Sequence, residues 1–338
     1  MRYTTTLIVL NIALWGSVAT PIGLAAEGWA KKTDMIDSRF NHSTVEMGGK
    51  LIAIGGSQAG WNLISTAEEY DPEKDTWEKK DPMPTKRFGA IAATVNGKVY
   101  VIGGGRPAWF GVPAVEEYDP ATGKWTKKND MPKPIWYGGG AAVDGIIYVI
   151  AGVTDGPAMT QDIWAYSPEN DTWKLMKSVA PKLIANHTVA AVNGRIYVIG
   201  GTNNGVNRSS EVWEYDPSED QWMQKADMPT PRFNLSSCVV NDRIYAIGGD
   251  NLGAVMLSAV EVYDPVKNKW TAEANIPTPR SNLSSSVIDG RIYVTGGTSV
   301  WQPVPLTTVE EYTPEGWPFI VSMWAKLATT WGDIKNGR

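Results

Sequence analysis

Short apolar runs recur along the chain at a nearly constant spacing, with polar and turn-forming residues between them. The six runs end in a Gly pair or a close variant of it: LIAIGG at 51–56, VYVIGG at 99–104, IYVIAG at 147–152, IYVIGG at 196–201, IYAIGG at 244–249 and IYVTGG at 292–297. Corresponding positions are 48 or 49 residues apart. A period of about 50 residues made of short strands predicts blades around a common axis.

Residues 77 to 125 show how one repeat predicts a four-stranded antiparallel blade. FGAIAATV after Arg87 is the first expected strand, and Asn96-Gly97 is a strong hairpin signal that turns the chain into KVYVIGG. AVEEYDP is the third expected strand and ends at Pro120, which has no N–H for a ladder. A turn at Thr122-Gly123 then leads to KWTKK, the expected outer strand.

Each repeat also carries a Tyr about 15 residues after its Gly pair, and five repeats carry a Trp seven residues beyond the Tyr. One such ring buries about 150–250 Å², so thin blades are expected to stack on their neighbours to cover these rings. The pattern resembles the kelch family over about residues 28 to 316. The resemblance implies an all-β, six-bladed β-propeller of four-stranded antiparallel blades. It implies no single activity, because the family includes peptide-binding adaptors, actin binders and a few enzymes.

The spacing of the tryptophans indicates how the ring closes. In the last repeat Trp317 follows Tyr312 by only five residues, whereas WAKKTDM near the N-terminus resembles the outer-strand sequence WTKKNDM. Trp29 precedes Arg39 by ten residues, which is the spacing of an outer-strand Trp from the next repeat. We therefore expect the strand around Trp29 to complete the last blade, within one propeller domain over residues 26–317.

The two ends differ in composition from the repeats. Arg2, an apolar stretch at residues 7 to 15 and the small residues Gly23 and Ala25 predict a signal peptide over residues 1–25. Cleavage is expected after Ala25, with cleavage after Ala26 as the near alternative. A membrane anchor needs about 20 apolar residues, which this stretch does not reach. The chain is therefore expected to be secreted or periplasmic. Residues 318–338 form a C-terminal tail with a short helical stripe, which either docks on the ring or serves sorting.

Charge and cysteine content exclude some classes of function. The formal net charge is −5, which argues against a nucleic-acid surface because such a surface needs a concentrated basic face. Cys238 is the single cysteine, so neither a disulfide framework nor a thiolate metal cage can form within the chain. We expect a monomer with no cofactor and no metal.

Ligands of propellers bind at the channel mouth, where the kelch resemblance places the loop entering each inner strand and the loop after each Gly pair. Arginines stand sixteen residues before the first position of the Gly pair in four repeats, and repeats three and four have Ile135 and Ile184 there. The candidate ligand-binding residues are Arg39, Arg87, Arg232 and Arg280, the neighbouring Phe40, Phe88, Trp136 and Phe233, and the loop residues Trp61, Arg106, Trp109, Arg208 and Trp301.

These candidates suit a carboxylate-bearing or sugar-like ligand, because arginines form bidentate hydrogen bonds and aromatic rings stack. Amides at the next repeat position add polar groups to the same rim: Asn41, Asn186, Asn234 and Asn282. Kelch adaptors that bind acidic peptides have arginines at matching positions, so the resemblance implies the same role here. The structural alternative is that each arginine pairs with a neighbouring carboxylate or backbone group, and that the phenylalanines are wedge packing.

Two functions remain open from the sequence. The first is an exported interaction module that binds a protein, peptide or glycan at the loop face, and it is favoured because no catalytic constellation is visible. The alternative is a periplasmic sugar mutarotase or epimerase. It would use His42, His187 or the arginines as acid and base, and the two histidines lie in repeats one and four on opposite sides of the ring. Repeat spacing places no third metal ligand beside the histidines.

Overall fold

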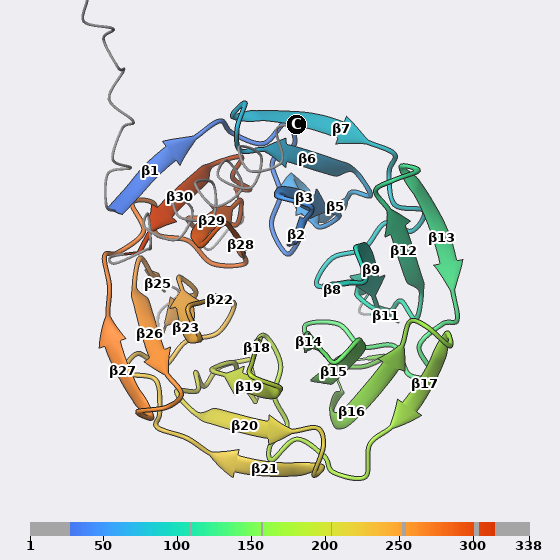
Figure 1. Ribbon diagram of the computed structural model, residues 1–338, viewed down its shortest axis with the longest axis vertical. Coiled ribbons are helices and arrows are strands. Elements are labelled where there is room, and N and C mark those ends of the chain that lie inside the picture. The colour runs from blue at the N-terminus through green and yellow to red at the C-terminus, as the bar shows by residue number, and fades with distance from the viewer. Residues whose placement is uncertain are drawn as a thin grey trace, which may run out of the picture.

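The repeats fold into six blades around an open axis (Figure 1). The structure is a computed structural model that describes residues 28–108, 110–156, 158–203, 205–251, 255–300 and 304–314. Each blade is a four-stranded antiparallel sheet, and the single helical element of these ranges is the short 3₁₀ turn η1 (Ala59–Trp61). The predicted six-bladed propeller is confirmed. The signal peptide and the tail predicted at the two ends lie outside the described residues.

The strands of the first three blades run outward from the axis in chain order. Blade one contains β2 (Ser43–Met47), β3 (Lys50–Ile54), β6 (Ala67–Asp71) and β7 (Thr76–Lys80). Blade two contains β8 (Ile91–Val95), β9 (Lys98–Ile102), β12 (Val115–Asp119) and β13 (Lys124–Lys128). Blade three contains β14 (Gly139–Val143), β15 (Ile146–Val153), β16 (Met159–Ser167) and β17 (Thr172–Leu175).

The other three blades repeat this order, and the last one recruits the N-terminal strand. Blade four contains β18 (Thr188–Val192), β19 (Arg195–Ile199), β20 (Val212–Asp216) and β21 (Gln221–Gln224). Blade five contains β22 (Ser236–Val240), β23 (Arg243–Ile247), β26 (Val260–Asp264) and β27 (Lys269–Ala272). Blade six contains β28 (Ser284–Ile288), β29 (Arg291–Thr295), β30 (Val309–Thr313) and β1 (Gly28–Lys32).

Short hairpins decorate the loops that follow three of the Gly pairs. They are β4 (Ser57–Gln58) with β5 (Asn62–Leu63), β10 (Gly105–Arg106) with β11 (Phe110–Gly111), and β24 (Asp250–Asn251) with β25 (Val255–Met256). These loops and the segments that enter the inner strands lie side by side, because isolated bridges join Phe40 to Ser57 and Phe88 to Gly105. We call the side of the ring that carries them the loop face.

The ring closes as the sequence predicts, with β1 beside β30 (Figure 1). Trp29 lies opposite Tyr312 in this pair, and their rings stack with centroids 4.9 Å apart. The Trp29 indole N–H also donates to the carbonyl of Ala274 at 2.8 Å. Because β1, the first strand of the chain, completes the last blade, the outer edge of β30 is hydrogen-bonded and not exposed.

Aromatic residues join each blade internally and to its neighbour. All six repeat tyrosines lie against the Trp of the adjacent outer strand, with ring centroids 4.8–5.1 Å apart. In blades one, two, three and five the indole N–H donates to a carbonyl just beyond the outer strand of the preceding blade, as Trp29 does: Trp77 to Thr33, Trp125 to Asp81, Trp173 to Asn129 and Trp270 to Ala226. These tryptophans therefore connect adjacent blades, as expected for residues of the core. We call each indole-to-carbonyl hydrogen bond of this kind a tryptophan strut.

The Gly pair is needed because the chain passes close to other backbone atoms there. A Cβ added to Gly104 would lie 3.0 Å from the carbonyl oxygen of Phe88, and the residue has a φ of 104°. Blade three has Ala151 at the first position, where it adopts a φ of 52°. Its second position is Gly152, whose added Cβ would meet Gly138 at 2.7 Å. Added Cβ atoms would be crowded at both positions, but φ is 52–67° at the first and 89–117° at the second, so the second position is the one that requires glycine.

Candidate functional site

The mouth of the axial channel is built from one residue of each blade. These residues are Asn41, Gly89, Tyr137, Asn186, Asn234 and Asn282, and all have φ between 51° and 56°. Each backbone N–H donates to the carbonyl of the preceding member at 2.8–3.0 Å, and Asn41 donates to Asn282, so the six bonds form a closed ring. Asn and Gly tolerate this left-handed conformation, which explains why amides gather here.

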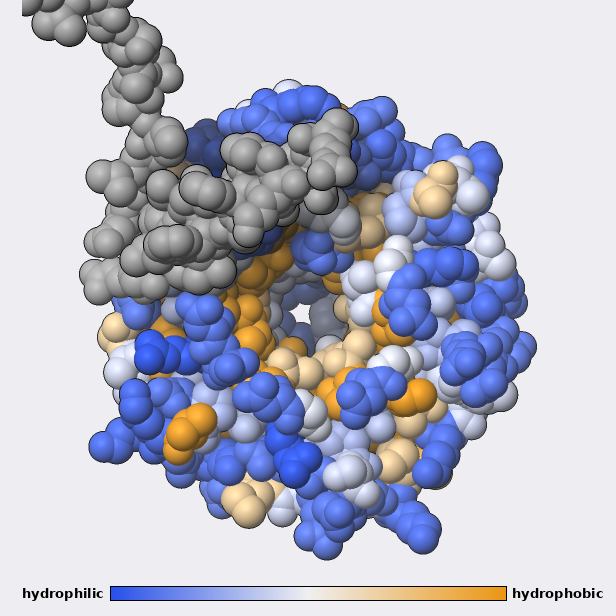
Figure 2. Space-filling view, viewed as in Figure 1, coloured by the Kyte–Doolittle hydropathy of each residue, from blue (hydrophilic) through white to orange (hydrophobic). Residues whose placement is uncertain are grey.

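The side chains of this mouth ring are linked across the opening. The Asn41 amide donates to the Tyr137 hydroxyl at 2.8 Å, and the Asn186 amide donates to the carbonyl of the Asn234 amide at 2.6 Å. Asn234 also donates to Asp250 at 3.1 Å. Figure 2 shows that the ring is open along its axis and that hydrophobic residues are among those bordering the opening on the face in view.

The four repeat arginines are buried, with exposures of 0–1%. Each guanidinium group pairs with a glutamate in the third strand of its own blade: Arg39 with Glu68, Arg87 with Glu116, Arg232 with Glu261 and Arg280 with Glu310. The Nη–Oε distances are 2.5–2.8 Å. The basic arc expected at the rim is therefore not present in this structure, because a guanidinium group enclosed between strands cannot meet a ligand from solvent. The structural pairing left open by the sequence describes these residues.

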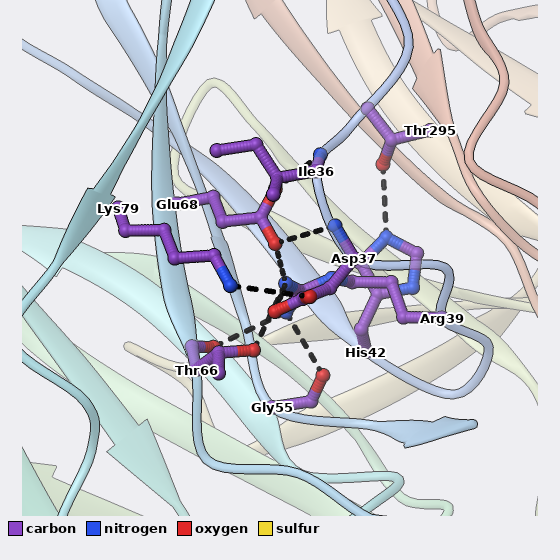
Figure 3. A network of polar contacts seen from close by, with 9 residues as sticks. All are labelled: Ile36, Asp37, Arg39, His42, Gly55, Thr66, Glu68, Lys79 and Thr295. Carbon is purple, nitrogen blue, oxygen red and sulfur yellow. Dashed lines mark hydrogen bonds and ion pairs between the residues drawn. The ribbon is translucent and has the colours of Figure 1, made fainter.

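Figure 3 shows this arrangement in blade one. Arg39 donates to the carbonyls of Gly55 and Thr66, at 3.1 and 3.2 Å, as well as to Glu68. Glu68 also accepts the backbone N–H groups of Ile36 and Asp37. Burial raises the pKa of the Glu68 carboxyl, and the adjacent guanidinium opposes that shift. The network holds the segment between β1 and β2 against the blade.

Blades three and four use a different pair, and the sequence carries its signal. Ile135 and Ile184 replace the arginine, and the residue two before the Tyr changes from Glu to Trp164 or Trp213. An apolar contact thus replaces a buried ion pair, since each tryptophan packs against the same core cluster as its isoleucine. Sequence reasoning noted the missing arginines but missed this coupled change from Glu-x-Tyr to Trp-x-Tyr.

A lysine two residues before each isoleucine supplies a more exposed ion pair in these two blades. Lys133 lies 2.9 Å from Asp162 in blade three, and Lys182 pairs with Glu211 in blade four. Both lysine side chains are about half exposed. The propeller is therefore asymmetric, with four blades of one kind and two adjacent blades of another.

The aromatic residues next to the arginines are also buried: Phe40, Phe88, Trp136 and Phe233 are 1–7% exposed. Phe88 lies between Trp61 and Trp136, with ring centroids 5.8 and 5.6 Å away. The Arg208 guanidinium lies 4.3 Å from the Phe233 ring centroid and pairs with Asp250 at 3.0 Å. Apart from the pocket edge offered by Phe88, these rings act as packing, in line with the structural alternative.

Two of the predicted loop residues are accessible on the loop face. Trp61 is 47% exposed, and Arg106 is exposed and lies 5.7 Å from the centroid of the Phe110 ring. A pocket of about 330 Å³ is lined by Trp61, Phe88, Arg106, Pro107 and Ala108. We call it the Trp61 pocket. The predicted residues Trp109 and Trp301 lie outside the described part of the chain.

Backbone strain marks this pocket. Trp61 and Ala108 have φ values of 60° and 65°, in the left-handed region that residues with bulky side chains seldom adopt. Most other non-glycine residues with positive φ in the described ranges are Asn or Asp in turns or in the mouth ring. The strain is held by packing, since the Trp61 ring meets Phe40 edge to face with centroids 5.0 Å apart.

Hydrophobic exposure is concentrated around this face. Twelve large hydrophobic residues are exposed among the described ones, and half of them lie in the loops after the Gly pairs: Trp61, Phe110, Val206, Val255, Val300 and Val304. We call these six residues the apolar rim. Exposed apolar groups that gather in one structural position of many repeats are typical of an interaction surface.

The two histidines lie inside the axial channel below the mouth ring. His42 and His187 are 7% and 6% exposed, and His42 Nε2 is 3.0 Å from the Thr295 hydroxyl. Burial lowers the pKa of both imidazoles, that of His187 to about 4, so both are neutral at pH 7. Within the described ranges no three His, Cys, Asp or Glu side chains gather as a metal site.

Comparison with known families identifies the repeat. The Kelch motif model matches residues 38–84, 86–132 and 279–317, and the model of the KLHDC2/KLHL20/DRC7 Kelch-repeats domain matches residues 132–297. The chain belongs to the kelch-repeat family. The Kelch matches together extend over nearly all of the ring described above. Kelch propellers are typical protein-interaction modules.

Solved structures and curated proteins add a fold comparison. The "Structure of YjhT" superposes with a TM-score of 0.74 and 15% sequence identity, covering 84% of this chain and 97% of that chain. At this identity the likeness concerns the kelch fold alone. The comparison with curated proteins finds no match. No helix in the described ranges has the length and apolar character needed to cross a bilayer.

Proposed function

We propose that this kelch propeller is an exported interaction module whose loop face binds a segment of a partner protein. The observation that carries the proposal is the strained and exposed Trp61 beside Arg106, at the edge of an apolar pocket. Trp and Arg are the residues most often found at binding hot spots, because each offers a large contact area and a polar group. Export rests on the predicted signal peptide, and N-terminal sequencing of the secreted protein is expected to begin at Ala26.

The chemistry of the pocket indicates the kind of segment that fits. Its walls are the Trp61 and Phe88 rings, which favour an apolar side chain, and the Arg106 guanidinium favours a carboxylate beside it. The apolar rim extends this contact around the loop face. A peptide with a large apolar residue next to Asp or Glu therefore matches both features of the site.

A peptide library displayed on phage tests this proposal directly. Selection on the immobilised full chain is expected to enrich apolar–acidic sequences whose binding is lost in Trp61→Ala and weakened in Arg106→Ala. Leu175→Ala is the matched control, because Leu175 is 49% exposed on the outer strand of blade three, away from the pocket. Peptides that bind Trp61→Ala as well as the original chain, or a library that yields no peptide, would contradict the proposal.

The mutarotase alternative is less well supported by this geometry. It needs an acid or base at the mouth, and both histidines are enclosed in the channel with lowered pKa values. The arginines named for the same role are held by glutamates inside the blades. Anomer exchange followed by NMR with a panel of sugars would reopen this alternative if the rate rose above that of the buffer.

A further inference from the structure

The segment entering blade four is one residue longer than its counterparts. Ile184 follows Trp173 by eleven positions, whereas Ile135 follows Trp125 by ten. Blade four also lacks its strut, because the Trp222 Nε1 has no hydrogen-bond partner among the described residues. The extra residue has therefore displaced the segment from the position that it takes in the other blades.

A pocket of about 260 Å³ lies beside this segment. Residues 180 to 184 form one of its sides and residues 207 to 211 another, while Val198, Trp213 and Trp222 belong to blade four itself. Four other blades hold a buried guanidinium group and a glutamate at the corresponding positions of the repeat. We call this space the blade-four pocket.

The four blades that contain the buried arginine, which we call the sister blades, show which groups a guanidinium contacts in this part of a blade. In blade five Arg232 donates to the backbone carbonyls of Ala246 and Ala259, at 3.2 and 3.0 Å. Val198 and Glu211 stand at these two repeat positions in blade four, and both line the pocket. Blade four thus retains the acceptor positions of its sisters but lacks the side chain that uses them.

Among the charged groups that line the pocket, the Glu211 carboxylate is the one that an incoming cation can reach by replacing Lys182. One oxygen of the Glu211 carboxylate pairs with the Lys182 ammonium, and the other accepts the Trp213 indole N–H at 3.0 Å. The Lys182 side chain is 54% exposed and can swing into solvent. Arg208, the other cation here, is held by Asp250, and Asp227 adds a second carboxylate to the lining.

We propose that the blade-four pocket binds the guanidinium group of an arginine side chain from a partner. The group replaces the Lys182 ammonium at Glu211, donates to the backbone carbonyls of Val198 and Glu211, at the positions that the arginine uses in blade five, and stacks on an indole ring. A planar guanidinium with five donors fits several fixed acceptors and an aromatic face, whereas an ammonium group acts as a point charge. This site is separate from the Trp61 pocket and has the opposite charge preference.

Calorimetric titration of the full chain with N-acetyl-arginine amide tests the proposal. We expect binding of this probe and at least about tenfold weaker binding of the neutral N-acetyl-citrulline amide, since the charge-assisted hydrogen bonds are lost. Glu211→Gln should weaken arginine binding about tenfold for the same reason, and Lys182→Ala should strengthen it. Trp61→Ala should bind the probe as the original chain does, which separates this site from the proposed function.

A variant that places an arginine of the chain itself in the pocket is the strictest control for arginine binding; we call it the refilled variant. Ile184→Arg with Trp213→Glu rebuilds the ion pair of the sister blades, so the fold should be kept and arginine binding abolished. The proposal would be overturned if the original chain bound the citrulline and arginine probes equally, or if it did not bind the arginine probe at all. It would also be overturned if Lys182→Ala did not bind the arginine probe, or if the refilled variant bound it as well as the original chain does. If the refilled variant does not fold, the comparison of Glu211→Gln with the original chain decides.

Discussion

At the scale of single residues, the buried arginines are each paired with a glutamate of their own blade, and we expect these pairs to stabilise the fold. Burial lowers the pKa of Arg87 to about 10, which leaves it charged at pH 7, and Glu116 neutralises it. Arg87→Ala would leave the Glu116 carboxylate buried without its partner, so we expect a loss of about 3–5 kcal/mol in the free energy of unfolding. Urea denaturation measures this loss.

The matched control for Arg87→Ala is the double variant Arg87→Ile with Glu116→Trp, which copies blade three. It should be clearly more stable than the single variant, because an apolar pair of this kind already exists in the ring. A single variant as stable as the original chain would show that the ion pair is not what holds this position.

His187 makes stability depend on pH. Its pKa is about 4 in the folded protein and near 6.5 in the unfolded chain, so between these values the unfolded chain binds more protons. The free energy of unfolding must then fall as the pH is lowered from 6.5 to 4. His187→Leu, which copies Leu235 and Leu283 at this repeat position, should remove on the order of 1–2 kcal/mol of that loss at pH 5.

Denaturation curves at pH 7 and pH 5 test this effect, since the difference between the two chains isolates His187 from the carboxyl groups. An equal loss of stability in both chains would assign the acid sensitivity to other groups. His42, whose pKa is also lowered by burial, contributes in the same direction and is unchanged in both proteins.

At the scale of elements, the tryptophan struts connect each outer strand to the preceding blade. Trp125→Phe removes the hydrogen bond to Asp81 and should lower the free energy of unfolding by about 1 kcal/mol beyond the loss of ring contacts. Trp222→Phe supplies a control within the same molecule, because no such bond exists for Trp222 in the described part of the chain. Equal losses in urea denaturation would mean that ring packing alone explains the role of these tryptophans.

The sequence predicts elements better than it predicts the site, for a physical reason. Strands, turns and their order follow from local alternation and from Asn-Gly or Gly pairs, which act within a few residues. Whether Arg39 faces solvent or Glu68 depends on a partner 29 positions away that the local pattern does not indicate. The coupled changes of blades three and four, where Ile and Trp together replace Arg and Glu, carry that information in the sequence. By contrast, the sequence indicates Trp61 directly, because it lies in the loop after the first Gly pair.

At the scale of the whole molecule, every blade depends on its neighbours, and the ring depends on one five-residue strand. β1 pairs with β30 from Gly28–Thr313 to Lys32–Val309 and carries the Trp29 strut. Removal of residues 1–32 should therefore expose the edge of β30 and uncover Tyr312, which is 2% exposed in the closed ring. We expect a lower thermal midpoint and a tendency to associate through the open edge.

Removal of residues 1–27 is the matched control, because it leaves β1 in place. That shorter deletion should unfold at the midpoint of the full chain and elute from a size-exclusion column as a compact monomer. Trp29→Phe in the same background removes the strut but keeps the ladder, and it should fall between the two deletions. If the chain without residues 1–32 kept its thermal midpoint, the ring would be held by contacts between adjacent blades and not by its closure. The order of these three midpoints therefore measures how much of the stability depends on the closed ring.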